Sequence, residues 1–215
     1  AGNEKYKQVG EVFIGFGLLF TGMESMKLAV SPLAEYKGFT DLLSTFGRYP
    51  ILGLLLGFGI TAIIQSSSAA MGMLVVLASQ GLVPLASALP ILYGQNIGTC
   101  VTELLSSIGT SKNAKRVAVV HLYFNIIGTL LFLTVFYLFN AFIGFSFVDG
   151  VVGAKEIAIV HTIFNLSTSI ILLPFIKVLE KLAYLTVKDK EGEGNKDNIE
   201  EQFKLLDERF LQSPS

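Results

Sequence analysis

The feature that most limits the fold of this chain is a run of 54 consecutive residues, 49–102, that contains no Asp, Glu, Lys or Arg. Further uncharged runs cover residues 117–148 and 157–176. Because a helix rises 1.5 Å per residue, about 20 apolar residues cross the hydrocarbon core of a bilayer. Charged residues make up 15% of the chain, whereas typical soluble domains carry about 25%. The sequence therefore predicts an all-α integral membrane protein of the cell (inner) membrane, with the lipid bilayer as its partner.

Three segments predict spanning helices, at residues 12–30, 117–139 and 157–176. The first is interrupted by Glu24 and Lys27, which lie one turn apart on one helix face. Charges at membrane depth are usually paired or face a protein interior, and these two side chains are suitably spaced to pair. The alternative is that this helix ends near Glu24 and leaves for the interface.

The 54-residue run is too long for one helix and has no charged turn that would divide it into two. Three glycines precede a polar tetrad at residues 65–68, and a second polar segment with two glycines follows at residues 94–99. The apolar pieces of about 12 to 16 residues are too short to span a bilayer and too apolar for surface loops. We therefore expect a re-entrant hairpin and discontinuous helices, with breaks at these two segments. Breaks of this type lie at binding sites in membrane transporters.

The first polar segment is Gln65-Ser66-Ser67-Ser68. A buried hydroxyl costs free energy unless it is hydrogen-bonded. In one interpretation the serines bond back to helical carbonyls and pack a tight helix crossing. In the other, a half-helix begins here and continues over residues 69–80. Serine hydroxyls and free backbone N–H groups then converge at the positive end of its dipole and bind an oxyanion without a formal positive charge.

The second polar segment contains candidate ligands for a cation. Gly94 and Gly98 are expected to permit unusual backbone conformations at a helix break. Hard cations such as sodium prefer oxygen ligands, and the side chains here offer amide and hydroxyl oxygens. Glu103 lies just beyond the segment and is either an ion ligand or the point where the helix returns to water. The candidate oxygen donors are Gln95, Asn96, Thr99 and Thr102.

An internal repeat with a period of 40 residues places His121 and Asn125 in register with His161 and Asn165. Residues at i and i+4 share a helix face, so each of the last two spanning helices presents a small polar patch. One interpretation is that these side chains join helices by hydrogen bonds. The other is a role in a proton relay or an ion site.

The distribution of basic residues predicts the orientation, because Lys and Arg collect on the cytoplasmic side of a membrane. They flank both outer ends of the last helix pair, so the loop at residues 140–156 should face outward. Residues 1–180 are expected to form a membrane repeat. Residues 181–215 are expected to form a charged cytoplasmic linker, with an amphipathic helix at residues 198–210 that leads to a further C-terminal domain. The flanking basic residues are Lys112, Lys115, Arg116, Lys177, Lys181, Lys188 and Lys190.

Composition disfavours several other classes of function. The net charge of −1 and the absence of a basic stripe argue against a nucleic-acid partner. Cys100 is the single cysteine, so it forms no internal disulfide and fits a small buried residue. No nucleophile with a positioned base is evident, so the chain is not expected to be an enzyme, and no organic cofactor is expected.

These segments together resemble the sodium/phosphate cotransporter family, the type II group and its bacterial relatives. The resemblance rests on residues 61–69, on residues 94–99, and on Asn113-Ala-Lys115-Arg116 followed by His121 and Phe124-Asn125. It covers nearly all of residues 10–180. The tail segment Leu206-Asp207-Glu208-Arg209 is similar to one that joins the membrane domain to a PhoU-like helical domain in many bacterial members.

The resemblance implies a transporter of two inverted repeats, each with one Gln-Ser-Ser motif at a re-entrant hairpin, that binds inorganic phosphate and coupling sodium ions between them. The implied phosphate contacts are Gln65, Ser66, Ser67, Ser68, Asn96 and Thr99. The implied sodium ligands are Gln65, Ser67, Ser68, Gln95, Asn96, Thr99 and Thr102.

Two departures from the family pattern bear on this interpretation. Gln95, Cys100 and Glu103 stand where relatives generally carry smaller or less polar residues. The chain also holds one Gln-Ser-Ser-Ser motif, so it resembles the second repeat. Its site would be completed either by a missing first repeat, because the chain is a fragment, or by a second copy in an antiparallel homodimer. The alternative functions are a phosphate-responsive membrane regulator and a carrier for another oxyanion such as sulfate or arsenate.

Overall fold

The computed structural model describes residues 2–188 of the chain. This part is helical apart from short connections and one isolated bridge between Pro84 and Val151. The amphipathic helix expected at residues 198–210 lies outside the described residues. In chain order the elements are α1 (Gly2–Glu35), α2 (Lys37–Arg48), α3 (Pro50–Ile64), α4 (Ser67–Ser79), α5 (Leu85–Ser106), α6 (Lys112–Ile143), α7 (Ala154–Leu172), the 3₁₀ turn η1 (Leu173–Phe175) and α8 (Ile176–Thr186).

Within residues 2–188, three helical stretches are long and apolar enough to cross a membrane, and they correspond to the three predicted spans. They cover Glu4–Ala29, Lys112–Ile143 and Ala154–Thr186. The alternative in which the first span ends near Glu24 is wrong, because α1 continues to Glu35. Glu24 pairs instead with Lys27, at 3.9 Å between carboxylate oxygen and ammonium nitrogen. The chain is an all-α integral membrane protein, as its sequence predicts.

The polar tetrad forms the turn of a short helical hairpin. Helix α3 ends at Gln65, whose φ of 56° and ψ of 26° lie in the left-handed region, and such a residue stops a helix. Helix α4 begins directly afterwards, and the Ser66 hydroxyl caps it by accepting a hydrogen bond from the N–H of Ala69 at 3.3 Å. The helix start predicted at this segment is therefore confirmed.

The second predicted break, at residues 94–99, is wrong, because α5 runs unbroken through it. Its glycines serve a close helix crossing instead. A Cβ on Gly94 would collide with the carbonyl oxygen of Leu54 in α3, and one on Gly57 of α3 would collide with the carbonyl oxygen of Ile91. A Cβ on Gly98 would lie 2.7 Å from the Cβ of Thr61. Small residues spaced four apart allow two backbones to approach closely in a membrane.

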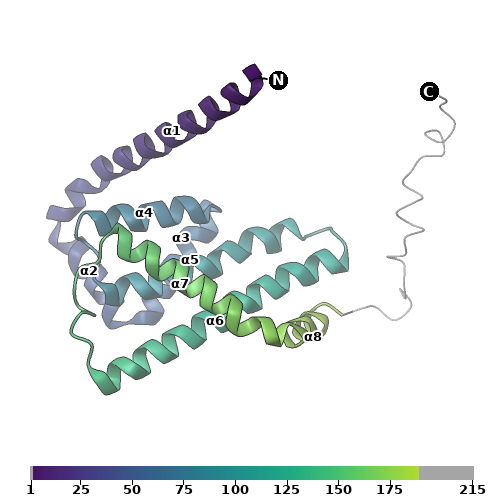
Figure 1. Cartoon of the computed structure of the whole chain (residues 1–215). Coiled ribbons are helices and arrows are strands. Elements are labelled where there is room, and N and C mark those ends of the chain that lie inside the picture. Colours follow the sequence, from purple (N-terminus) through teal and green to yellow (C-terminus); the bar gives the residue numbers. More distant parts are fainter. Residues whose placement is uncertain (1, 189–215) are drawn as a thin grey trace.

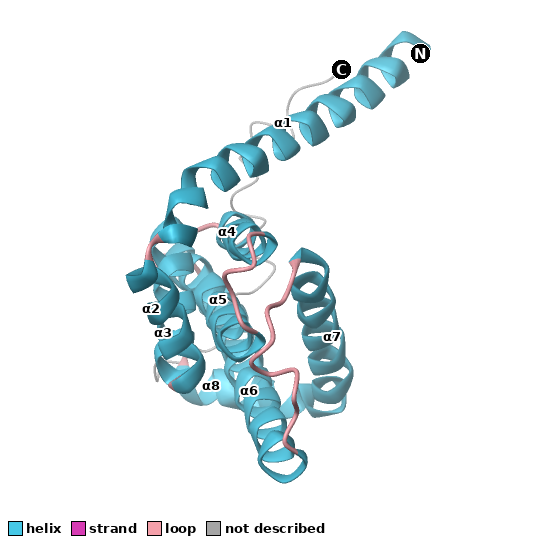
Figure 2. Ribbon diagram, turned by 90° about the vertical axis from the view of Figure 1, so that its left-hand side faces the viewer, coloured by secondary structure: helices cyan, strands magenta, loops and turns pink. Residues whose placement is uncertain are grey.

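Helix α5 is the centre of the fold. It packs against α2, α3, α4, α6 and α7, and Figure 2 shows it between the α3 side and the α7 side of the molecule. Tyr93 of α5 packs on Phe164 of α7, with ring centroids 4.6 Å apart, and Phe132 of α6 lies 5.2 Å from the same Phe164 ring. These side chains form part of one apolar core. Helix α1, by contrast, projects from the helical body (Figure 1).

Candidate functional site

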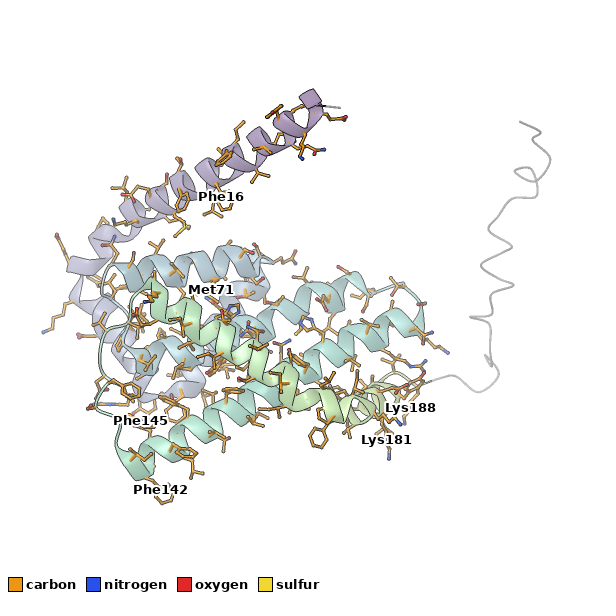
Figure 3. The ribbon with its side chains drawn as sticks, in the orientation of Figure 1. Phe16, Met71, Phe142, Phe145, Lys181 and Lys188 are labelled. Carbon is orange, nitrogen blue, oxygen red and sulfur yellow. The ribbon has the colours of Figure 1, made fainter. Side chains whose placement is uncertain are left out.

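A cavity of about 530 Å³ lies beside the first turns of α4, within this apolar bundle. It is bounded by α4, α5, α6 and α7, with one residue of α1 at its edge. Met71 of α4, labelled in Figure 3, belongs to its apolar wall. Among the described lining residues none is Asp, Glu, Lys or Arg. The polar ones are Ser67, Ser68, Gln95, Asn96, Thr99, His121, Asn125, His161 and Asn165.

The first turn of α4 brings hydroxyl groups and a helix N-terminus to the cavity. Ser67 and Ser68 are the first two helical residues and line it, whereas Ser66 is the capping residue and its oxygen is engaged with Ala69. The first N–H groups of a helix have no partner within the helix and lie at the positive end of its dipole. Hydroxyl and N–H donors at the positive end of a helix dipole are the chemical groups that stabilise anions.

Two neighbouring amides on α5 face the cavity with one atom each unpaired. The Nε2 of Gln95 donates to the carbonyl oxygen of Ala70 in α4 at 2.9 Å, which leaves its buried Oε1 without a partner in the described structure. The Oδ1 of Asn96 accepts from the Nε2 of His161 in α7 at 3.2 Å, and its buried Nδ2 has no partner within residues 2–188. Thr99 bonds back to the carbonyl oxygen of Gln95 at 3.1 Å.

Both copies of the 40-residue repeat attach to α5. His161 bonds to Asn96, and His121 of α6 bonds through Nδ1 to the Oε2 of Glu103 at 2.6 Å. Asn96 and Glu103 lie seven residues apart, which is two helical turns, so they share one face of α5. The predicted interhelical hydrogen bonds are thus confirmed. Glu103, whose side chain is 47% exposed near the end of α5, thus has His121 as a partner.

Within each copy of the repeat, the asparagine donates a hydrogen bond to the backbone of the histidine one helical turn earlier. Asn125 donates to the carbonyl oxygen of His121 at 3.0 Å, and Asn165 donates to that of His161 at 2.8 Å. The Nδ2 of Asn125 also lies 3.4 Å from the sulfur of Cys100, the buried thiol on α5. The asparagines therefore bond to the backbone, whereas the imidazoles are held from α5, His121 by Glu103 and His161 by Asn96.

The structure brings together five of the residues that the sequence predicts for the site: Ser67, Ser68, Gln95, Asn96 and Thr99. Three others do not line the cavity. Gln65 is exposed at the turn, Ser66 caps α4, and Thr102 lies a turn beyond Thr99 on α5. The sequence did not predict that the two histidines and their asparagines share this cavity with the serines. The 40-residue repeat shows that both helices carry a His and an Asn on one face, but it does not show toward which neighbouring helix that face points.

The model of the Na+/Pi-cotransporter family matches residues 30–152, which is more than half of the chain. The chain belongs to this family. The matched residues include the α3–α4 hairpin, all of α5 and the His121 copy of the repeat, whereas α7 with His161 lies beyond them. Na+/Pi-cotransporters are transporters rather than enzymes.

Similar proteins include bacterial and mammalian members. The uncharacterized protein YqeW of Bacillus subtilis (strain 168) is 33% identical over 132 residues, which cover 61% of this chain and 43% of that protein. The putative inorganic phosphate export protein YjbB of Escherichia coli (strain K12) is 29% identical over 126 residues, 59% of this chain and 23% of that protein. The sodium-dependent phosphate transport protein 2A of Rattus norvegicus is 31% identical over 195 residues, 84% of this chain and 30% of that protein.

The chain therefore spans less than half the length of each of these relatives. No solved structure matches it at a significant level.

Proposed function

We propose that this chain supplies half of a site for sodium-coupled transport of inorganic phosphate across a membrane, and that the polar cavity beside α4 is that half-site. One observation carries the proposal: the first turn of α4, with Ser67 and Ser68, opens into a cavity lined by hydroxyl, amide and imidazole groups. Membership of the Na+/Pi-cotransporter family supports it, as do the phosphate export and sodium-dependent phosphate transport named for two relatives.

Neutral donors suit a transported anion. Ser67, Ser68 and the free N–H groups of α4 stabilise phosphate through hydrogen bonds and the helix dipole. A buried Lys or Arg would hold the anion more tightly and slow its release. Gln65 and Ser66, at the tip of the hairpin, are proposed to contact phosphate from the edge of the site.

Oxygen atoms in and beside the same cavity suit sodium. The unpaired Oε1 of Gln95 and the hydroxyls of Ser67, Ser68 and Thr99 are neutral oxygen donors. Thr102 is proposed to contribute from one turn farther along α5. Sodium bound here would offset the charge of phosphate, which is a physical basis for coupling the two ions.

The proposed site is completed by a second half. We assign residues 1–180 to one repeat of the transporter, opposed by another Gln-Ser-Ser repeat. That repeat comes either from the rest of a longer polypeptide or from a second copy of this chain. Residues 181–215 are proposed to link the repeat to a further domain on the cytoplasmic side.

The test is radiolabelled phosphate uptake into proteoliposomes, with inward sodium and potassium gradients compared. It uses this chain and the longest polypeptide that contains it. Ser67→Ala and Ser68→Ala should each lower the sodium-dependent rate by about tenfold or more at low phosphate, because each removes a hydrogen bond to a charged ligand. Ser79→Ala is the matched control at the far end of α4, where the hydroxyl bonds to Val76 at 2.7 Å.

The outcomes separate the parts of the proposal. Equal uptake by the parent and both serine variants would remove these serines from the site, and equal uptake in potassium would reject sodium coupling. Uptake by this chain alone would mean that two copies complete the cavity. Excess unlabelled sulfate or arsenate should compete less well than phosphate, and stronger competition by either would identify another oxyanion as the substrate.

A further inference from the structure

Two amide side chains that line the cavity, those of Gln95 and Asn96, are each held by one end. We propose that this fixed orientation assigns one ion to each side chain. The Nδ2 of Asn96 donates a hydrogen bond to the phosphate anion, and the Oε1 of Gln95 is a ligand of the sodium ion. His161 is the positioning residue that fixes Asn96. This inference rests on the proposed function, and it assigns each ion to one side chain.

The side-chain oxygen of Asn96 is already hydrogen-bonded. An amide oxygen only accepts hydrogen bonds, so the Nε2 of His161 must be the donor in the 3.2 Å contact. With Oδ1 occupied, the remaining group of Asn96 is the NH₂, and it is buried without a partner in the described part of the chain. A buried donor without a partner is costly. An anion in the cavity would satisfy it.

In Gln95 it is the side-chain nitrogen that is already hydrogen-bonded. Its Nε2 donates to the carbonyl oxygen of Ala70 in the first turn of α4. Its Oε1 is therefore free to accept, and the side chain is only 3% exposed. Neutral carbonyl oxygens are ligands for hard cations in membrane transporters. A sodium ion at Oε1 would satisfy this atom.

The geometry of α5 separates the two roles. Consecutive residues of a helix point about 100° apart, so Gln95 reaches α4 while Asn96 reaches α7. The two free atoms belong to neighbouring residues, so the bound ions of opposite charge would lie close together. Asn96 thus serves phosphate alone, rather than both ions as the family resemblance implies.

The test measures ligand-induced stabilisation of the full chain in detergent, because a ligand that binds the native state raises the midpoint of thermal unfolding. Sodium is titrated as its chloride against choline chloride, and phosphate is titrated at saturating sodium. Asn96→Asp replaces the donor by an acceptor and keeps the bond to His161. It should raise the phosphate concentration for half the effect by about tenfold or more, while the response to sodium is kept or strengthened.

Two histidine variants test the positioning role. His161→Leu removes the donor and should produce the same loss of phosphate response as Asn96→Asp, with the sodium response intact. His161→Gln should restore the phosphate response, because its Nε2 lies near the place of the imidazole Nε2. Gln95→Met should lose the sodium response. Asn140→Asp in α6 is the matched control: it keeps the oxygen that accepts from Phe145, outside the cavity, and should keep both responses.

Each result decides the question. Separate loss of the two responses, with rescue by His161→Gln, supports the assignment. Variants that lose both responses together, or neither, would overturn it while the proposed function stands. No response to phosphate from either this chain or the longest polypeptide that contains it would instead reject the proposed function. If Asn96→Asp fails to fold, the comparison of His161→Leu with His161→Gln still decides the role of Asn96.

Discussion

At the scale of single residues, glycine sets how closely the two central helices approach. The α3–α5 crossing leaves no room for a Cβ on Gly94, where the carbonyl oxygen of Leu54 would be struck. Gly94→Ala should therefore force the helices apart and lower the free energy of unfolding by about 3 kcal/mol or more, in the range of severe overpacking. Unfolding by increasing denaturing detergent, followed by circular dichroism, measures the change.

Gly59 in α3 provides the control for that prediction. A Cβ there would meet nothing within 4 Å. Alanine favours the helix by about 0.5–1 kcal/mol relative to glycine. Gly59→Ala should therefore leave stability unchanged or slightly raised. Equal effects of the two substitutions would contradict the close crossing and would favour a flexible role for Gly94.

Local residue patterns predict some features of this region and not others. Ser66 could be predicted as a helix cap, because capping depends on the few residues that follow it. Gly94 and Gly98 were interpreted as a helix break, since sequence spacing does not distinguish backbone freedom from close packing. The bond between Asn96 and His161 joins residues 65 positions apart. It depends on where α7 crosses α5, which no local pattern specifies.

At the scale of elements, Arg116 joins the start of α6 to the end of α8. Its Nε and Nη2 donate to the carbonyl oxygen of Val187 at 3.2 and 3.1 Å, and its guanidinium lies 3.9 Å from the ring centroid of Tyr184. A cation is also favourable at the carboxyl end of a helix. These contacts dock α8 on α6, together with a hydrogen bond of 2.8 Å between the hydroxyls of Tyr123 and Thr186.

Arg116→Met should loosen α8 and make trypsin cleavage at Lys181 about tenfold faster, because hydrogen bonds to a charged group contribute about 1.5–3 kcal/mol. Timed digestion and mass spectrometry of the fragments measure the rate. Lys115→Met is the matched control, since it also removes one neighbouring basic residue and one trypsin site. If both variants were cleaved at the same rate, Arg116 would not be what holds α8.

Elements differ in how well the sequence predicts them. The spans α6 and α7 follow from long uncharged runs, because lipid requires an apolar helix of this length. Within residues 49–102 the sequence predicts the turn between α3 and α4 and the end of α4 near residue 80, but it also predicts a break at residues 94–99, where α5 is continuous. The difference is physical: the first boundary has a capping serine and a left-handed residue, whereas the second segment has only glycines that suit packing.

At the scale of the whole molecule, basic residues are concentrated at the α8 end of the bundle, while Arg48 lies near Phe145 and Asp149 at the other end. Lys181 and Lys188 lie at one end, and Phe142 and Phe145 lie at the other (Figure 3). The contact of Arg116 with Val187 places the basic start of α6 beside the basic α8. The loop at residues 144–153 closes the opposite end, where its carbonyl oxygens accept from the N–H groups of Leu85 and Ala86 at the start of α5. Basic residues favour the cytoplasmic side, so the α8 end should lie there.

Cysteine labelling in intact cells tests this orientation without first removing the native thiol, because Cys100 is buried. Ser146→Cys, on the exposed 144–153 loop, should react with a membrane-impermeant maleimide added outside. Lys181→Cys, on the exposed face of α8, should react only after the membrane is permeabilised. The parent chain measures background labelling of Cys100. The reverse pattern would place α8 outside, and labelling of both sites in intact cells would mean that the chain inserts in two orientations, as an antiparallel pair of identical copies requires.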